Sequence, residues 1–430
     1  MNFVGLSTDQ APPISAPLRF FLTAPLFGVL AGLLILFSDS ATLMSRYSIE
    51  SIVVTHLITI GFFSFVMFGA LTQMLPVLVG AKMLRVKLAT TIAHVLMSVG
   101  MLSMAGGLLL HNTTLNFIAL SGLGSGFLVM ILSVIYAIRG VEHITATLRG
   151  MKRSIYFALL ILFMGLYLLY GYLSGTQDAL HLAIANIHSV LAIFGFAGIL
   201  IIGVAFQVLP MFYVAPKFKN FCKKYVVNLI SIGLLLWFVL NFFLEEYALV
   251  GKFWIALFFW AFATTVWIKL NRRKRPVSDV TVWYWRAASL FLTLGSFLWI
   301  FDEFFKHEYI VMVAILIGGG FILSILVGML YKIVPFLVWF HLNALGYMSI
   351  PTINEMIDKR VAKVQFGLLI SALVGFVFSF YMSELLSISA VAFVVSMILL
   401  EYNILAPVLL YIKTKKTKPN FDMSAFGNLS

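Results

Sequence analysis

Apolar residues are arranged in runs of about twenty, separated by short polar loops, and this pattern continues along the whole chain. The runs do not alternate between apolar and polar residues, as the strands of a membrane barrel would. As helices, they are long enough to cross a hydrocarbon core of roughly 30 Å. The pattern therefore predicts an all-α polytopic membrane protein. Twelve transmembrane helices are expected at 18–38, 51–80, 87–110, 114–138, 153–174, 179–213, 224–244, 247–270, 281–301, 308–341, 362–383 and 387–412.

Charged residues lie mainly in the loops, and the sign of the charge alternates from one loop to the next. One set of loops is basic, with Arg85, Arg153 and Lys274 among its residues, whereas the opposite set carries acids such as Glu50 and Glu245. Basic loops of membrane proteins face the cytoplasm. The alternation therefore predicts both termini in the cytoplasm and places the protein in a bacterial inner membrane. Because the net charge of +13 is explained in this way, no nucleic-acid partner is expected.

Composition predicts a single membrane domain over residues 1–430. The chain is 62% hydrophobic and 10% charged, so it has no segment suited to a soluble domain of useful size. It contains one cysteine, Cys222, which excludes an intramolecular disulfide and a metal site built from several thiolates. The first residues, MNFVGLSTDQAPP, contain an acid and no basic residue, which is not the pattern of a cleavable signal peptide.

A sixteen-residue motif occurs three times without gaps, at 61–76, 195–210 and 320–335. It has the form G-x7-G-x3-[QK]-x2-P, and its polar position is Gln73, Gln207 and Lys332. The copies fall in the second, sixth and tenth predicted helices. The motif therefore predicts three parallel four-helix repeats, at approximately 18–138, 153–270 and 281–412.

The motif has two interpretations. Glycines eight residues apart on one helix allow a neighbouring backbone to approach closely, which would make the motif a packing device. Alternatively, the three polar residues form a ring around a pseudo-threefold axis. Helix packing is the preferred interpretation. Lys332 supports the second one, because a lysine inside the membrane is costly and is commonly functional, unless its side chain extends to the inner face.

The second predicted helix, with its flanks, reads THLITIGFFSFVMFGALTQMLPVLVGAK. It resembles the second helix of subunit I of the haem-copper oxidases, which is also built from three four-helix units. The earlier segment PLRFFLTAPLFGVLAG is similar to the start of NnrS-type proteins, a haem- and copper-associated branch of the same superfamily. This resemblance implies that His56 is a haem ligand, and that haem b and copper are the candidate cofactors.

Several features of the catalytic oxidases are missing. The seventh span, YVVNLISIGLLLWF, lacks the histidine pair that binds copper, and Ile315 occupies the position of the family's H-x-H in the tenth span. The arginine pair before the last span is also absent, since Glu384 is the only charge there. We therefore expect a protein without the binuclear centre, and the sequence favours a role other than that of an enzyme.

Two groups of residues are candidate ligands. His56 and His188 come from different repeats at similar depth, so they could form an axial pair on a haem or share a metal, or each could simply be hydrogen-bonded within the bundle. A methionine-rich face of the third helix would suit Cu(I), although methionine is also an ordinary apolar filler. The residues of that face are His94, Met97, Met101 and Met104.

The leading hypothesis is a haem- or copper-binding inner-membrane protein related to the oxidase subunit. Its role would be in nitric oxide tolerance or in respiratory haem and metal handling. One alternative is a solute or ion transporter, in which Gln73, Gln207, Lys332 and the ionisable Glu401 of the last helix line the pathway. Another is a non-catalytic assembly partner of an oxidase complex. The expected partners are the lipid bilayer and subunits of respiratory complexes.

Overall fold

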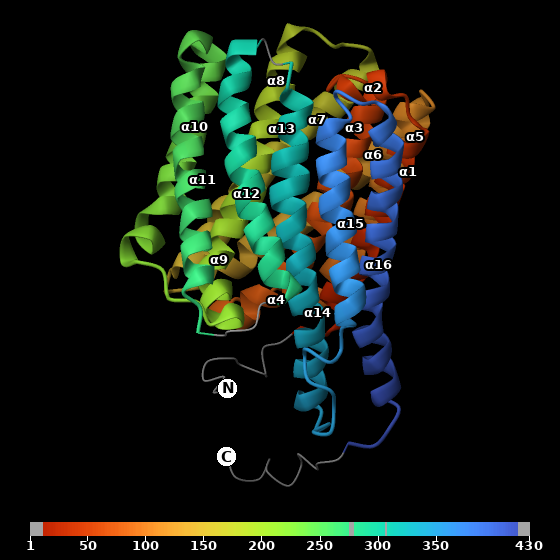
Figure 1. The fold of residues 1–430 in the computed structure, drawn as a ribbon, viewed down its shortest axis with the longest axis vertical. Helices are drawn as coiled ribbons and strands as arrows, with labels where there is room; N and C mark the ends of the chain where they lie inside the picture. Colours follow the sequence, from red (N-terminus) through yellow and green to blue (C-terminus); the bar gives the residue numbers. More distant parts are fainter. Residues whose placement is uncertain (1–11, 275–278, 306–307, 420–430) are drawn as a thin grey trace.

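The computed structural model describes residues 12–274, 279–305 and 308–419, and no β-strand occurs among them. Twelve helices are long and apolar enough to cross a membrane, so the predicted count is confirmed and the chain is an integral membrane protein. Figure 1 shows them side by side along the long axis of the bundle. The spans are α1 (Ser15–Phe37), α3–η2–α4 (Ile49–Val79), α5 (Val86–Leu109), α6 (Thr113–Arg139), α7 (Ala146–Ser174), α8–η3–α9 (Ala179–Tyr213), η4–α10 (Cys222–Phe243), η5–α11 (Glu245–Asn271), α12–η6 (Val280–Phe305), α13–η7–α14 (Ile310–Ala344), α15 (Lys359–Phe378) and α16 (Glu384–Thr414).

The two ends of the described chain lie at the same end of the bundle, where each contacts the region around the end of α14. Nε2 of His341, near the end of α14, lies 3.0 Å from the carbonyl oxygen of Pro12. The hydroxyl of Tyr347 donates to the carbonyl of Thr417 at 2.7 Å. We call this the basic end, because it carries the basic loops identified in the sequence.

The start of the fifth span differs most from its predicted position. Helix α7 begins at Ala146 rather than at 153, so Arg149 lies within the helix. The side chain of Thr145 caps the helix by accepting a hydrogen bond from the Leu148 amide at 3.1 Å. The guanidinium of Arg149 donates to the carbonyls of Lys223 and Lys224 at 2.9 and 2.8 Å. These contacts explain why a basic segment that resembles a loop is helical.

The second, sixth and tenth spans each contain a π-helical segment. These segments are η2 (Leu57–Ser64), η3 (Leu191–Gly198) and η7 (Ile315–Leu323). A π-turn holds one more residue than an α-turn and is common at functional sites. The three spans that carry these segments are also the most deeply buried of the twelve. They therefore form the centre of the bundle.

The three central spans contact the first helix of each predicted repeat in the same way. The first motif glycine, which lies in the π-helical segment, packs directly on a phenylalanine, and an added Cβ would overlap that ring. The second motif glycine approaches the same helix again, six or seven residues earlier in that helix's sequence. The first contacts are Gly61–Phe27, Gly195–Phe157 and Gly320–Phe291; the second are those of Gly69 with Phe20 and Phe21, Gly203–Gly150 and Gly328–Tyr284.

Candidate functional site

Two histidines from different central spans face each other. His56 ends α3 and His188 lies near the end of α8, so each comes just before a π-helical segment. Their ring centroids are 6.4 Å apart and the ring planes are inclined by 26°. Both side chains are half-buried. The structure therefore brings together the two histidines that the sequence placed at similar depth.

Hydrogen bonding leaves the second nitrogen of His56 available as a ligand. Its Nδ1 atom lies 2.7 Å from the carbonyl oxygen of Ile52, one helical turn earlier. Because a carbonyl only accepts hydrogen bonds, Nδ1 carries the proton and Nε2 keeps its lone pair. A backbone carbonyl that fixes the tautomer in this way is the usual partner of a metal-bound histidine.

His188 packs closely against a glycine of a neighbouring helix. A Cβ added at Gly165 of α7 would come within 3.0 Å of the His188 Cε1 atom, so this position needs a glycine to make room for the ring. The Nδ1 atom of His188 is buried and has no hydrogen-bond partner among the described residues, while the imidazole also interacts with the backbone of Ile161 on α7. Since buried polar atoms are normally satisfied, this imidazole retains unused bonding capacity.

The geometry of the pair can be compared with that of two imidazoles on one metal ion. Two metal–nitrogen bonds of about 2.1 Å, together with the radii of the rings, put the centroids roughly 6 Å apart. Copper and zinc ions normally take three or four protein ligands, and no group of three or more histidine, cysteine, aspartate or glutamate residues suited to a metal occurs in the described parts of the chain. A haem brings four nitrogens of its own and needs only two axial ligands. By number of ligands, the two histidines therefore suit a haem rather than a bare ion.

The methionine-rich face of α5 contacts two different helices. Nε2 of His94 lies 2.9 Å from the hydroxyl of Thr23 on α1, with the imidazole against Phe20 and Phe65. Met97 instead lies against Gly126 of α6, where an added Cβ would come within 2.8 Å of its Cγ. Met101 and Met104 are buried as well. The predicted Cu(I) ligands thus have ordinary packing partners.

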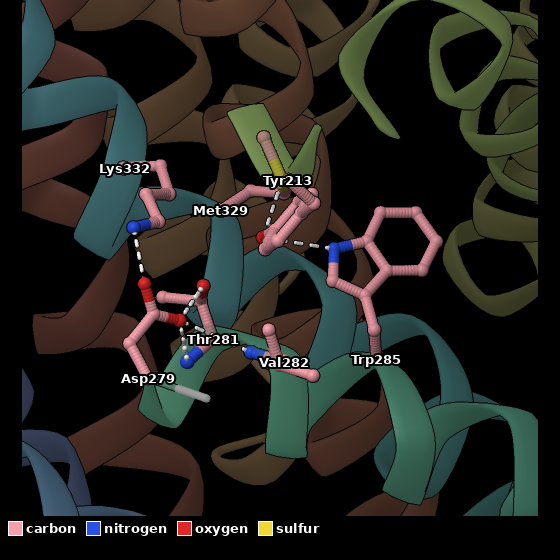
Figure 2. Close-up of polar contacts among 7 residues, drawn as sticks. All are labelled: Tyr213, Asp279, Thr281, Val282, Trp285, Met329 and Lys332. Carbon is pink, nitrogen blue, oxygen red and sulfur yellow. Dashed lines mark hydrogen bonds and ion pairs between the residues drawn. The ribbon is translucent and has the colours of Figure 1, made fainter. Parts of the chain in front are cut away.

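A network of polar side chains occupies the basic end of the third predicted repeat (Figure 2). Asp279 caps α12, and its Oδ1 accepts hydrogen bonds from the amides of Thr281 and Val282 at 3.1 and 3.3 Å. Its Oδ2 pairs with the ammonium of Lys332 at 2.5 Å. In Figure 2 the indole of Trp285 points to the hydroxyl of Tyr213, which accepts its hydrogen bond at 3.1 Å.

Burial and charge have opposite effects on the Asp279 carboxyl group. Partial burial by itself would raise the pKa of Asp279, because it disfavours the charged form. The nearby Lys332 ammonium and the hydrogen bonds from Lys332, Thr281 and Val282 stabilise the carboxylate. The combined effect is a pKa below the ordinary value, so Asp279 is ionised and the pair is a salt bridge.

The three polar residues of the repeated motif do not share one set of partners. Lys332 is bound to Asp279. Gln73 is 3% exposed, has no hydrogen-bond partner among the described residues, and lines a cavity of about 30 Å³ between α4, α9 and α14. Gln207 is half-buried and is not one of the residues that line this cavity. The three positions are therefore equivalent in sequence but have different surroundings.

Glu401 lies close to the basic end rather than deep in the bundle. The amide of Asn403, two residues further on, donates to the carbonyl of Asp358 at 3.3 Å, and Asp358 caps the start of α15. The Oε2 atom of Glu401 is buried without a hydrogen-bond partner among the described residues. Lys332 does not pair with Glu401, because its partner is Asp279.

A second polar cluster surrounds Gln365 of α15, a residue that no sequence pattern indicated. The hydroxyls of Tyr284 and Tyr331 both donate to its carbonyl oxygen, the latter at 3.1 Å. Its amide nitrogen donates to the Ser396 hydroxyl at 2.9 Å. All four residues are buried. The cluster joins α12, α14, α15 and α16, and its members are too far apart in sequence to form a recognisable motif.

No protein-family model matches this chain, and none of the curated proteins matches it. The chemistry of the described residues is therefore the basis for any functional proposal.

Proposed function

We propose that this protein is a haem-binding integral membrane protein in which His56 and His188 would hold the haem iron. The observation that carries the proposal is the facing arrangement of their imidazoles, with ring centroids 6.4 Å apart. The free Nε2 of His56 and the unpartnered Nδ1 of His188 both support it. The ligand count favours haem over copper, which would need further donors.

Each residue has a definite task in this proposal. The carbonyl of Ile52 orients the His56 ring and increases its basicity through the Nδ1 proton. Gly165 leaves room for the His188 ring. A haem held by two imidazoles supplies one-electron chemistry. With both ligands supplied by the protein, a bound haem would suit electron transfer or haem handling rather than oxygen reduction.

We further propose membership of the haem-copper oxidase superfamily, in a non-catalytic branch. The π-helical segments η2, η3 and η7, which lie at matching positions, and the glycine–phenylalanine contacts support a threefold repeat, whereas a fourth π-helical segment, η4 (Cys222–Val226), lies outside this pattern. The basic loops support a bacterial inner-membrane location with the basic end in the cytoplasm. A role in nitric oxide tolerance or respiratory haem and metal handling, beside subunits of respiratory complexes, is consistent with this location.

The test is an absorption spectrum. The protein would be purified in mild detergent from cells supplied with haem and copper, and spectra would be recorded before and after dithionite reduction, with iron and copper analysis of the same sample. We expect a Soret band that shifts on reduction and one equivalent of iron, both lost in His56→Ala. His94→Ala is the matched control, because that imidazole already has a partner in Thr23. A colourless, metal-free and folded protein would contradict the proposal.

A second candidate function, solute or ion transport, is favoured by two unpartnered polar groups. Gln73 lines the central cavity without a hydrogen-bond partner, and the Glu401 carboxyl has a buried oxygen without one, among the described residues. Transport would appear as a pH-dependent flux into vesicles that is lost in Glu401→Gln. A colourless protein that shows such a flux would favour this function over haem binding.

A further inference from the structure

A cluster of cations lies on one side of the basic end, at the second predicted repeat. The two stretches of chain that supply most of it are free of acids: no aspartate or glutamate occurs at 179–244 or at 248–278. In Figure 1 the segment that joins α9 to α10 lies at the side of the bundle. We call this cluster the basic shoulder and define it as Arg149, Lys219, Lys223, Lys224, Lys269 and Arg272.

Two of these cations, Arg149 and Lys269, bind backbone carbonyls of the segment that joins α9 to α10. Arg149 donates to the carbonyls of Lys223 and Lys224 at 2.9 and 2.8 Å. Lys269 donates to the carbonyls of Pro216 and Lys217 at 3.0 and 2.9 Å. The backbone of the segment is therefore bound by charged side chains at both of its ends. This arrangement pre-organises the segment, which reduces the entropy lost when a ligand binds.

The positive charges of the shoulder repel one another. Lys219, Lys223 and Arg272 lie close enough to Lys269 to interact with it electrostatically. Within the described residues, the two ion pairs Lys332–Asp279 and Lys252–Glu303 lie elsewhere, and none involves the shoulder. Lys219 and Lys224 are exposed. A bound anion would relieve this repulsion, so the shoulder has the electrostatics of an anion site.

Aromatic and aliphatic side chains beside the cations indicate which anion fits. Phe221 and Tyr225 are 60% and 41% exposed, and their ring centroids are 5.2 Å apart. The Lys224 ammonium lies 5.1 Å from the centroid of the Tyr225 ring. The exposed apolar surface continues along α10 through Ile232 and Leu235, which are 58% and 50% exposed. Cations next to exposed rings, followed by a lipid-facing helix, form an interface between headgroups and acyl chains.

We propose that the basic shoulder binds the phosphate groups of anionic phospholipids in the leaflet at the basic end of the bundle. Lys219, Lys223 and Lys224 contact the phosphates, while the rings of Phe221 and Tyr225 lie at the boundary with the acyl chains. This inference concerns a surface and a ligand separate from the proposed haem site, and it does not depend on haem binding.

The test compares two lipids with the same acyl chains on the purified, detergent-solubilised full chain. Phosphatidylglycerol and phosphatidylcholine are titrated separately, and bound lipid is counted by native mass spectrometry. The test variant is Lys219→Ala/Lys223→Ala/Lys224→Ala, which removes three side chains and keeps the backbone carbonyls of residues 223 and 224 that accept from Arg149. The control variant, Lys413→Ala/Lys415→Ala/Lys416→Ala, removes the same charge from the end of α16. A third titration uses inorganic phosphate alone.

We expect phosphatidylglycerol to bind more tightly than phosphatidylcholine. Each cation near an anionic headgroup contributes about 1 kcal/mol, so the test variant should bind phosphatidylglycerol roughly 100-fold more weakly, and the control variant should keep most of the affinity. Equal binding of the two lipids would overturn the proposal. An equal loss in both variants would do so too, since binding would then follow net charge alone. Displacement of the lipid by millimolar phosphate would identify a soluble phosphate site and reject the lipid.

Discussion

The histidine pair and the Asp279–Lys332 network are both groups of polar side chains inside an apolar bundle, but they differ in how completely they are satisfied. In the network, Asp279 binds Lys332 and two backbone amides. In the separate Gln365 cluster, the glutamine binds two tyrosines and a serine. In the histidine pair, one nitrogen of His188 has no partner among the described residues. A satisfied cluster stabilises the fold, whereas an unsatisfied one has capacity left for a ligand. The contrast therefore separates a structural region from a binding region.

The largest expected effect is on the histidine pair. His188→Ala should abolish the haem Soret band, because the iron loses an axial ligand. Imidazole added to the buffer should restore part of it by entering the space that the ring leaves. The change is followed by absorption spectroscopy, with His341→Ala as control, since that ring contacts the carbonyls of Leu337 and Pro12. Retention of the full spectrum in His188→Ala would show that this residue is not a ligand.

The next largest effect is on stability. Lys332→Met should lower the free energy of unfolding by about 3 kcal/mol, because Asp279 would keep a partly buried charge without its partner. Lys332→Met/Asp279→Asn should recover most of this loss, since no charge remains and the asparagine still caps α12. Denaturation of the detergent-solubilised protein measures both. A double variant as unstable as the single one would mean that the charges themselves are not the cause.

A smaller effect should distinguish two buried glutamines. Gln365→Leu should destabilise the protein by about 2 kcal/mol, because the hydroxyls of Tyr284 and Tyr331 lose their acceptor. Gln73→Leu should be neutral or slightly stabilising, because the Gln73 amide has no hydrogen-bond partner in the described structure. The two variants are compared by thermal unfolding in the same detergent. Equal destabilisation would remove the proposed difference between the two sites.

The smallest effect concerns pH. The pKa of Asp279 is lowered in the folded protein, so its contribution to stability is complete above the ordinary value of 3.8 and is lost as pH falls through the lower folded value. Wild-type protein should therefore lose more stability than Asp279→Asn when the pH is lowered below 3.8. Unfolding curves across this acidic range test the difference. Parallel curves for the two proteins would contradict it.

The number and placement of the spans could be predicted because they depend on the composition of each segment alone. The start of α7 could not, because it depends on the carbonyls of Lys223 and Lys224, which come from a different part of the chain. The partner of Lys332 could not be predicted either, because it also comes from a distant part of the chain. The sequence singled out this lysine as costly in a membrane, but Asp279 is 53 positions away and lies just before a helix in a basic loop.

The candidate site was only partly accessible from sequence. Their similar depth suggested that His56 and His188 could meet. The distance between the rings and the angle between their planes depend on how each helix is rotated about its axis, which the sequence does not specify. The π-helical segments were not predicted. Segments η2 and η3 consist mainly of leucine, isoleucine, phenylalanine and glycine, which are equally common in ordinary transmembrane helices. Gln365 carried no signal, since a single buried glutamine has meaning only through its partners in space.

The π-helical segments have a consequence for how the two ends of the bundle can diverge. An additional residue in one turn changes the rotation of the preceding helical segment about the helix axis, relative to the segment that follows. In the second and sixth spans the histidines precede this turn and most of the packing motif follows it. Loss or gain of one residue there would rotate the ligand-bearing half and leave the tightly packed half undisturbed. The half of each span that carries the histidine can therefore change its orientation while the half that carries the packing motif keeps its contacts.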